Sequence, residues 1–468
     1  MTTSKKPKVI LAGWYGATNI GDELLLDVIG GWLRDFDCEL VIVSLNPDHT
    51  RKTFSCEAVD FHNLGAIAQA MTDADLFVMG GGGIFQDHHP FSIEALYDPV
   101  TPDIAQYARP FYMARQFGVK TAICAHGIGP ITTKPAREIV ADIFSKVDFV
   151  SVRDEKSAKL LKSLGVEREV VVAPDPGWLI DVNSQTSVPI PESFESVEKS
   201  RRRLGLIIRE WPEETQWNVK LLAALNQSLP ADWECLWIGF QNAVDEQYVV
   251  SDRPFLERMS YFLDRRIESS IAAPASIEET VGEIMSCDAV LSMRLHGGII
   301  TISAGKPVGF IEYDDKVVAA NNAINVPSSL RLALSDSVED FTKVITHLIE
   351  SADDGWQAEP NRLEELRNSA LQHKEVLREA TQSLNTNEMP RRWSSLDYDW
   401  LGGWIQSLIW REREAQKRST YAHSILQYRD VQLSELNKKI SDLEVEANTL
   451  RQNIRQLENR EVGNSSEN

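Results

Sequence analysis

Short apolar runs alternate with longer amphipathic segments along the first three quarters of the chain. Apolar residues that recur three and four positions apart predict helices, and short apolar runs bounded by turn residues predict buried strands. Strands that alternate with helices in this way are typical of parallel α/β sheets. The expected strands are 9–15, 40–45, 76–80, 121–125, 149–153 and 170–173 in a first series, and 204–209, 235–240, 289–292 and 308–313 in a second. The expected helices include 22–36, 135–146, 218–228 and 277–287.

The order of these patterns predicts two similar lobes followed by an extension. A chain of 468 residues is too long for a single core. A polar stretch at 181–200 separates the two series of strands and is typical of a linker. Two Rossmann-like lobes that face each other form a cleft at the carboxyl ends of their strands, where ligands bind. The expected parts are an N-terminal lobe at 1–180, a C-terminal lobe at 201–350, a helical Trp-rich segment at 361–410, a coiled coil at 411–460 and a disordered tail at 461–468.

The extension carries a heptad pattern. Apolar residues alternate three and four positions apart with charged and amide residues between them, which favours a coiled coil over an isolated solvated helix. The heptad residues are Leu433, Leu436, Ile440, Leu443, Ala447, Leu450, Ile454 and Leu457. Upstream, 362–384 is interpreted as a charged helix, and it is followed by Trp393, Trp400, Trp404 and Trp410. This tryptophan cluster fits internal packing, a dimer contact or a membrane surface, and we favour packing.

Composition and charge narrow the classes of function. The formal net charge of −21 argues against a nucleic-acid-binding protein, which would usually show a basic stripe. An anionic substrate stays open, because locally placed cations outweigh the net charge inside a cleft. The five cysteines are scattered without zinc or redox spacing and are interpreted as buried small side chains. Neither a signal peptide nor a membrane-spanning run stands out. We therefore expect a cytoplasmic protein, with peripheral attachment to the membrane left open.

The segment S-M-R-L-H-G-G at 292–298 carries the most informative side chains. A strand end that leads into a helix N-terminus favours an anion, because the first backbone N–H groups of the helix are unpaired. Arg294 and His296 lie two apart, so on an extended segment both side chains point to one side. Arginine offers a planar fork for a carboxylate or phosphate, and histidine offers a proton near neutral pH. An isolated R-x-H more often reflects an arginine paired with a buried aspartate and a histidine at a domain seam, but the flanking motifs favour a functional site.

Glycine-rich loops follow several of the expected strands. The loop G-W-Y-G-A-T-N-I-G-D-E at 13–23 leads into a helix that Asn19 or Asp22 can cap, and its glycines allow close approach. The four glycines at 80–83 are costly for stability, so a ligand or another part of the protein is expected to lie against them. The turn G-I-G-P at 127–130 follows the fourth strand in the same way.

Two arginines end strands, and several familiar site patterns do not occur. We interpret Arg209 as a ligand contact. For Arg153 two interpretations stay open, an internal ion pair and a side chain that faces the cleft. The first loop is not G-x-G-x-x-G, and no acidic residue ends the second strand to bind a ribose, so a nicotinamide cofactor is disfavoured. The adjacent pair at 88–89 cannot place both histidines on one metal from a regular strand, and no metal site is indicated. No G-x-S-x-G nucleophile motif is found.

Taken together, these motifs resemble those of the polysaccharide pyruvyl transferase family. In chain order they are the N-x-G-D-E loop at 13–23, the glycine run followed by Asp87, G-I-G-P at 127–130, S-V-R-D-E at 151–155, A-P-D-P at 173–176, I-I-R at 207–209, M-R-L-H at 293–296 and Y-D-D-K-V at 313–317. They span roughly residues 8–320. One departure is C-A-H at 124–126, where relatives commonly carry Gly-Gln, and it leaves the identity of the acceptor open.

The resemblance implies a GT-B-like fold and a transferase of polysaccharide biosynthesis in the cell envelope. Members transfer the pyruvyl group of phosphoenolpyruvate to a sugar, usually as a cyclic ketal across two hydroxyls, with release of phosphate. Phosphoenolpyruvate is then a co-substrate, and no cofactor is expected. The residues implied for catalysis and donor binding in the C-terminal lobe are His296 as general acid, Arg294, Arg209, Lys316 and Gly297. Those implied for the acceptor in the N-terminal lobe are Asn19, Asp22, Gly82, Gly83, Asp87 and His126. The general base is not assigned.

Other readings and partners stay open at the level of sequence. The main alternative is a GT-B glycosyltransferase that uses a sugar nucleotide, for which Glu312 is the one tempting ribose ligand. A non-catalytic scaffold is disfavoured by the intact arginine, histidine and glycine motifs. We expect a sugar or glycan acceptor, lipid-linked or free, and no nucleic acid. The coiled coil is expected to mediate homo-oligomerisation or binding to a partner protein, with the oligomeric state undetermined.

Overall fold

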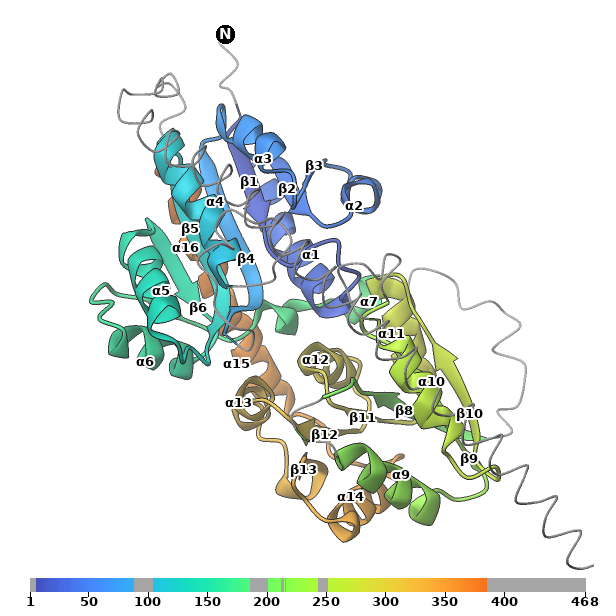
Figure 1. The fold of residues 1–468 in the computed structure, drawn as a ribbon. Helices are drawn as coiled ribbons and strands as arrows, with labels where there is room; N and C mark the ends of the chain where they lie inside the picture. The colour runs from blue at the N-terminus through green and yellow to red at the C-terminus, as the bar shows by residue number, and fades with distance from the viewer. Residues whose placement is uncertain are drawn as a thin grey trace, which may run out of the picture. The chain divides into compact units, whose positions relative to one another are not determined.

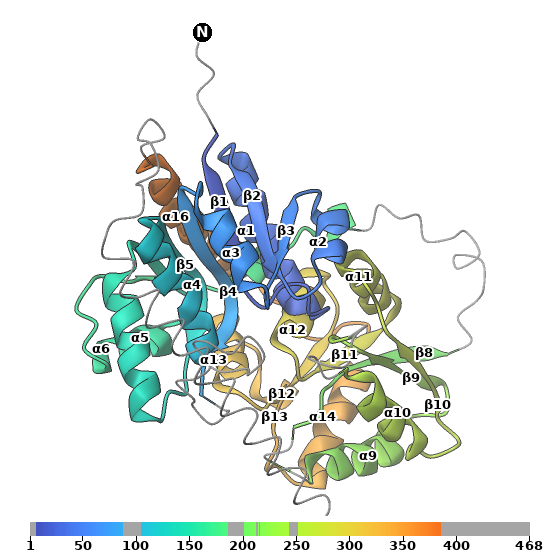
Figure 2. The same cartoon turned by 45° about the horizontal axis from the view of Figure 1, so that its top comes forward.

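A computed structural model of the protein describes residues 6–87, 104–185, 201–211, 214, 216–242 and 251–384. The chain divides into two compact units, 1–394 and 395–468, and the second lies outside the described residues. The predicted coiled coil, the four tryptophans of the Trp-rich segment and the tail therefore stay predictions. The first unit contains two parallel sheets, each covered by helices (Figures 1 and 2). This arrangement confirms the expected pair of Rossmann-like α/β sheets.

The N-terminal sheet has seven parallel strands in the order β3-β2-β1-β4-β5-β6-β7. Its strands are β1 (Lys8–Ala12), β2 (Glu39–Ser44), β3 (Glu57–Asp60), β4 (Leu76–Phe85), β5 (Lys120–Ile128), β6 (Phe149–Val152) and β7 (Val171–Val172). Its helices are α1 (Ile20–Asp35), α2 (Pro47–Phe54), α3 (Leu64–Met71), α4 (Ile104–Phe117), α5 (Lys134–Lys146) and α6 (Glu155–Ser163). Side chains alternate along each strand, so Val9 and Leu11 pack in the core on the α1 side, and Ile10 and Ala12 pack in the core with α3, α4 and α5.

The C-terminal sheet has six parallel strands in the order β10-β9-β8-β11-β12-β13. Its strands are β8 (Arg202–Ile207), β9 (Trp233–Ile238), β10 (Glu268–Ala272), β11 (Ala289–Ser292), β12 (Val308–Glu312) and β13 (Arg331–Ala333). Its helices are α9 (Trp217–Ser228), α10 (Arg253–Tyr261), α11 (Ile277–Ser286), α12 (Leu295–Ser303), α13 (Asp315–Ala323) and α14 (Val338–Glu350). Between the sheets lie a 3₁₀ turn at Pro176–Leu179 and the short α7 (Val182–Gln185). The rest of the expected linker, 186–200, is outside the described residues.

The last described helices return to the N-terminal sheet. α15 (Pro360–Ala370) contacts the turn at Pro176–Leu179, and α16 (Gln372–Gln382) packs on β5 and β6. Leu377 and Ala380 are fully buried in the core on the α1 side of that sheet. The single helix expected over 362–384 is therefore two helices, which separate at Leu371.

The two lobes are joined by main-chain hydrogen bonds at the start of α1. The N–H of Ile20 donates to the carbonyl of Phe240 at 2.9 Å, and the N–H of Asn242 donates to the carbonyl of Thr18 at 3.2 Å. Asn19 also forms an isolated antiparallel bridge with Gln241. The first helix of the N-terminal lobe thus begins on the backbone of the C-terminal lobe.

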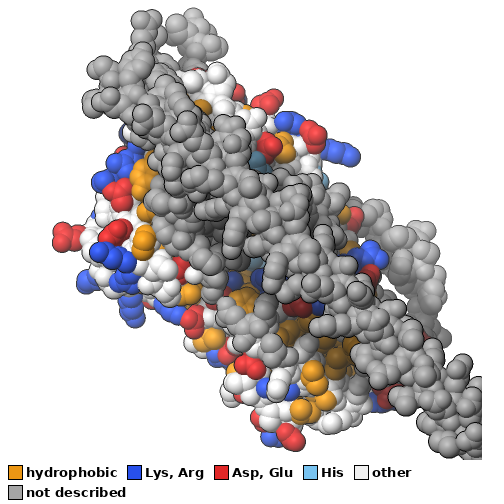
Figure 3. Space-filling model, in the orientation of Figure 1, with side chains coloured by type: hydrophobic (Ala, Val, Ile, Leu, Met, Phe, Trp, Pro, Cys, Tyr) orange, Lys and Arg blue, Asp and Glu red, His pale blue; other side chains and the backbone are white. Residues whose placement is uncertain are grey.

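Three strands were missing from the sequence prediction, namely β3, β10 and β13. Each lies at an edge of its sheet or near it, and each carries exposed or half-exposed positions. Acidic and basic side chains are interspersed on the side of the molecule where α5 and α6 lie (Figure 3). On α5, Lys146 and Asp142 form an ion pair. Four of the five cysteines are buried as expected, and Cys56 is half-buried. No helix in the described ranges is both long and apolar enough to span a membrane.

Candidate functional site

A cavity of about 540 Å³ opens between the two lobes, at the carboxyl ends of β4, β5, β6 and β12. One wall comes from the loops after β4, β5 and β6 together with α6, and the other from the end of β12 and the start of α13. Its charged and aromatic lining includes Arg153, Lys156, Trp211, Tyr313, Asp314 and Lys316. Ligands of open α/β sheets bind at this edge of the strands, so the cavity is the candidate site.

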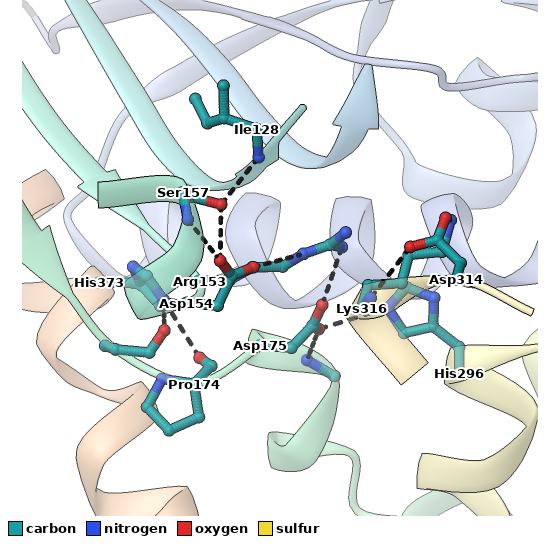
Figure 4. A network of polar contacts seen from close by, with 12 residues as sticks. Ile128, Arg153, Asp154, Ser157, Pro174, Asp175, His296, Asp314, Lys316 and His373 are labelled. Carbon is teal, nitrogen blue, oxygen red and sulfur yellow. Dashed lines mark hydrogen bonds and ion pairs between the residues drawn. The ribbon is translucent and has the colours of Figure 1, made fainter. Parts of the chain in front are cut away.

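A buried carboxylate connects side chains of both lobes beside the cavity (Figure 4). Nη1 of Arg153 lies 3.2 Å from Oδ2 of Asp175, and Nε2 of His296 lies 3.3 Å from Oδ1 of the same residue. The N–H of Gly177 also donates to Oδ1 at 2.8 Å. Burial by itself would raise the pKa of Asp175, but the charges and hydrogen bonds of His296 and Arg153 hold this pKa well below its ordinary value. Arg153 therefore both lines the cavity and forms an internal ion pair.

Three glycines make room for these side chains. A Cβ on Gly127 would lie 2.5 Å from Nε of Arg153. One on Gly177 would lie 2.9 Å from Cδ2 of His296, and one on Gly21 would lie 2.3 Å from Nδ1 of the same ring. Only glycine fits at these positions, because atoms of Arg153 and His296 already occupy the space that a Cβ would fill. The close approach expected at the glycine loops is thus made, in part, by Arg153 and His296.

Arg294 and His296 do not share one side of an extended segment, and that expectation was wrong. Arg294 is the N-cap residue of α12, and His296 already lies in the first turn of this helix. Successive helical positions are rotated by about 100°, so the two side chains diverge. Nη2 of Arg294 lies 2.5 and 2.6 Å from the carboxylate oxygens of Asp252, which also accepts the N–H groups of Phe240 and Gln241. His296 turns instead toward Asp175 at the seam between the lobes.

The positive charges of three cations act on Tyr313. Burial alone would raise the pKa of Tyr313, but the positive charges of Lys316, Arg209 and Arg294 hold it below its ordinary value. Nζ of Lys316 lies 5.4 Å from the centre of the Tyr313 ring, and the guanidinium of Arg209 lies 5.5 Å from that of Trp211. Within the described ranges, Arg209 forms no ion pair, and its buried Nε makes no hydrogen bond. This half-buried guanidinium without an acidic partner suits an anionic ligand.

The first turn of α1 carries two acidic residues with raised pKa values. Burial raises the pKa of the Asp22 carboxyl to about 6, although the positive charge of His296 opposes this shift. Burial also raises the pKa of Glu23 to about 7, while the N–H of Gly16 donates to its Oε1 at 2.8 Å. Oδ1 of Asp22 would lie 3.1 Å from a Cβ on Gly82, so this carboxylate rests against the glycine run, which lies within β4 and not after the strand as expected. Both residues change charge near neutral pH, which is common at functional sites.

The other acceptor candidates have structural contacts. The side chain of Asn19 caps α1 by accepting the N–H of Gly21 at 3.1 Å, as expected of either Asn19 or Asp22. Asp87 accepts the N–H groups of Thr132 and Thr133 at 2.7–2.9 Å. His126 is fully buried in β5, where burial, with the charge of Arg153, lowers its pKa to about 3.

Two candidate glycines also have defined positions. Gly83 lines the cavity, and Arg153 Nη2 lies 3.2 Å from the position of its Cβ. Gly297 faces the sheet, since a Cβ there would lie 2.7 Å from Oγ of Ser292 and 2.9 Å from Ile207. Of the sequence candidates, Gly83 and Lys316 therefore line the cavity itself, and Arg209, Arg294, His296 and Asp22 are placed around it.

Sequence reasoning missed Asp175, Asp252, Trp211 and Tyr313 as parts of the site. Asp175 and Tyr313 fall within motifs that matched the family pattern, so the signal was present without an assigned role. Asp252 and Trp211 lie in loops with no telling spacing, and their partners Arg294 and Tyr313 come from distant parts of the chain. Such pairs are formed by the tertiary fold and leave no local pattern.

Comparison with known families identifies the group to which the chain belongs. A family model described as polysaccharide pyruvyl transferase matches residues 19–315, which is more than half of the chain. The chain belongs to the polysaccharide pyruvyl transferase family. Membership implies a transferase with a polysaccharide acceptor. The matched range runs from the cap of α1 to the start of α13 and so includes Asp22, Arg209, Arg294 and His296.

Solved structures share the fold. The chain is similar to HepE of Anabaena in complex with UDP and glucose, at 14% identity and a TM-score of 0.52, over 80% of this chain and 98% of that one. It is similar to a sucrose-phosphate synthase of Thermosynechococcus elongatus, at 12% identity and a TM-score of 0.54, over 81% and 100% of the two chains. A glycosyltransferase of Rickettsia africae matches at 14% identity and a TM-score of 0.51, over 86% and 99%. At these identities the likeness shows a GT-B-like fold and nothing more.

Proposed function

We propose that the protein transfers the pyruvyl group of phosphoenolpyruvate to two hydroxyls of a sugar in a polysaccharide or its precursor. The product is a cyclic pyruvate ketal, and phosphate is released. The observation that carries this proposal is the half-buried Arg209, which has no acidic partner in the described chain and lies where the charges of Lys316 and Arg294 also converge. Family membership supports the same reaction class.

Phosphoenolpyruvate suits this group of cations. It carries a carboxylate and a phosphate, so its binding requires at least two cationic contacts. The proposed contacts are Lys316, which lines the second wall of the cavity, and Arg209, whose guanidinium lies 5.5 Å from the ring centre of the lining residue Trp211. Arg294 pairs with Asp252, but its positive charge still acts on Tyr313 at the cavity wall. The same cations would stabilise the phosphate as it leaves, since they are held in place before the reaction.

His296 is the proposed general acid. The enol carbon C2 accepts a hydroxyl only if the methylene carbon C3 receives a proton. His296 lies at the seam between the lobes, and Asp175 holds its Nε2 at 3.3 Å. A carboxylate at one ring nitrogen fixes the orientation of the ring. The loops after β4 and β5, with Gly83 on the cavity wall, are the proposed acceptor side.

Calorimetric binding of phosphoenolpyruvate and of UDP-glucose tests this function. The wild-type protein should bind phosphoenolpyruvate, and Arg209→Ala should weaken this binding by about tenfold or more, because it removes a charge-assisted contact. Arg294→Ala should weaken it as well. Arg258→Ala serves as the matched control, since Arg258 forms an exposed pair with Glu210 and should leave binding unchanged. Binding of UDP-glucose without phosphoenolpyruvate would instead assign the protein to sugar-nucleotide transfer and overturn the proposal.

A further inference from the structure

The imidazole of His296 lies against two parts of the N-terminal lobe, the carboxylate of Asp175 and the first turn of α1. Asp175 holds Nε2, and Nδ1 faces the first turn of α1, where a Cβ on Gly21 would lie only 2.3 Å away. The residue after Gly21 is Asp22, and among the positive charges that act on Asp22, that of His296 is the strongest. Nε2 of the ring is therefore held by Asp175, whereas Nδ1 faces the helix turn that carries Asp22.

The carboxylate of Asp22 differs from the other aspartates around the cavity. Asp175, Asp252, Asp314 and Asp87 all form ion pairs or accept backbone N–H groups. Across the described ranges, Asp22 has no hydrogen-bond or ion-pair partner for its carboxylate, and its first-turn neighbour Asn19 already caps the helix. Its Oδ1 rests against Gly82, and the next residue, Gly83, lines the cavity. A partly buried carboxylate without a partner at this place is available to a substrate hydroxyl.

We propose that Asp22 is the general base that takes the proton from the attacking sugar hydroxyl and passes it on to His296. This assignment rests on the proposed pyruvyl transfer and fills the one role that sequence reasoning left empty. In it, Asp22 and His296 form a base and acid pair, and Asp175 is the positioning residue that holds the acid.

The protons and electron pairs balance in two stages. In the first, the O–H bond of the acceptor breaks, its proton moves to Asp22, and the oxygen forms a bond to C2 of phosphoenolpyruvate. The C2=C3 electron pair takes a proton from His296, which makes C3 a methyl group. Asp22 then returns its proton to His296. In the second stage the C2–O bond to phosphate breaks, the second hydroxyl forms a bond to C2, and its proton leaves on the phosphate.

The electrostatic surroundings of Asp22 suit a base that works near neutral pH. Burial raises its pKa to about 6, so the carboxylate is ionised at pH 7 yet basic enough to accept a proton. The charged and titratable groups around it, on each neighbouring element, are Glu23 on α1, Tyr15 after β1, Tyr107 on α4, Arg153 after β6, Arg294 and His296 on α12 and Lys316 on α13. The cations oppose the effect of burial, which keeps the pKa in a useful range.

The decisive comparison is between Asp22→Asn and Asp27→Asn in the full-length protein. Asp27 lies on the same helix, is also partly buried, and has no contact with the site. The assay measures phosphate release from radiolabelled phosphoenolpyruvate. The acceptors are p-nitrophenyl galactoside, glucoside and mannoside, which each offer a suitable pair of hydroxyls. A reaction without a sugar gives the baseline rate with water as the nucleophile. We expect Asp22→Asn to lower kcat by about 10²- to 10⁴-fold and Asp27→Asn to leave it unchanged. The kcat of wild type should fall below pH 6, and this acidic limb should be absent in Asp22→Asn.

A second measurement needs no acceptor. Carbon NMR of aspartate-labelled protein should show a side-chain carboxyl that titrates near pH 6 in wild type and in Asp27→Asn, and that is missing in Asp22→Asn. A kcat within threefold of wild type in Asp22→Asn, or an Asp22 carboxyl that titrates at the ordinary value for aspartate, would overturn the assignment. Binding of phosphoenolpyruvate distinguishes failure of the proposed function from failure of the assigned base. If Asp22→Asn binds phosphoenolpyruvate and still turns over, only the assignment of Asp22 as the base is wrong. If wild type does not bind it, the proposed function and the base fail together.

Discussion

Oδ1 of Asp175 and Nε2 of His296 lie 3.3 Å apart across the seam between the two lobes. The other oxygen of the same carboxylate pairs with Arg153 at 3.2 Å, and the side chain of Asp175 is only 5% exposed. One buried group from the N-terminal lobe thus orients the proposed acid of the C-terminal lobe and an arginine of the cavity wall. Folding and chemistry should both depend on this carboxylate.

Asp175→Asn should lower stability and turnover together. Removing one partner of a buried ion pair leaves the other charge uncompensated, which costs about 3 kcal/mol or more. Asp315→Asn is the matched control, because its pair with Lys156 is about two-thirds exposed on both sides and should contribute less than about 1 kcal/mol. Urea unfolding of both variants measures the difference. Equal stability of the two variants would contradict the role of Asp175 as a buried pairing group.

Gly177→Ala should displace the His296 ring with little effect on the backbone. The added Cβ would lie 2.9 Å from Cδ2 of His296 and 3.0 Å from Oδ1 of Asp175, so the ring and the carboxylate must separate. We expect turnover to fall at least tenfold and stability to fall by about 1–3 kcal/mol. In Gly31→Ala, nothing lies within 4 Å of the added Cβ, and the substitution should stabilise α1 by about 0.5–1 kcal/mol. Normal turnover in Gly177→Ala would show that the position of His296 does not matter.

The buried His373 should make the folded protein less stable in acid. Its Nδ1 contacts Oγ of Ser151 at 2.8 Å, its Nε2 contacts the carbonyl of Ala173 at 3.1 Å, and burial lowers its pKa to about 4. The unfolded chain binds the proton first, so this contribution is complete above about pH 6.5 and is lost as the pH falls through 4. The difference in unfolding free energy between wild type and His373→Gln should therefore shrink by about 3 kcal/mol from pH 7 to pH 4. The exposed His347→Gln serves as control, and a difference that does not vary with pH would refute the prediction.

Two truncations separate the role of α16 from that of the extension. A chain that ends after Glu388 keeps α16 and should bind phosphoenolpyruvate as the full chain does. A chain that ends at Ala370 loses the buried Leu377 and Ala380, and we expect it to unfold at much lower urea concentration. Light scattering of the chain that ends after Glu388 also tests the predicted coiled coil. Its mass should fall relative to the full-length assembly, and an unchanged mass would contradict the oligomerisation idea.

The central strands were predictable because they are buried on both faces. β4 and β11 consist of apolar and small residues, β1 and β8 do so after one and two basic residues at their starts, and each was placed within a few residues of its observed bounds. β10 reads E-S-S-I-A and lies at a sheet edge, where one side of the strand meets water. Edge strands need less apolar surface, so their sequences resemble loops. The division of 362–384 into α15 and α16 also left no clear signal, since the residue between them, Leu371, does not break helices.

The candidate residues could be chosen from the sequence, but their geometry could not. Arg209, Arg294, His296 and Lys316 stand out in motifs at strand ends, and of these Lys316 lines the cavity while the charges of Arg209 and Arg294 act on Tyr313 at its wall. Their partners were not predictable, because Asp252 and Asp175 come from 42 and 121 residues away along the chain. The start of α12 immediately after Arg294 was also missed, and it separates two side chains that an extended segment would hold together.

The hydrogen bond from Ile20 to Phe240 has a consequence for the timing of the reaction. It fixes the start of α1 on the C-terminal lobe two residues before Asp22, so the same contacts that hold the lobes together also set the separation of Asp22 and His296. An opening of the lobes would part the proposed base from the proposed acid. Under the proposed mechanism, proton transfer between them would therefore require the arrangement of the lobes seen here, with the start of α1 held on the C-terminal lobe.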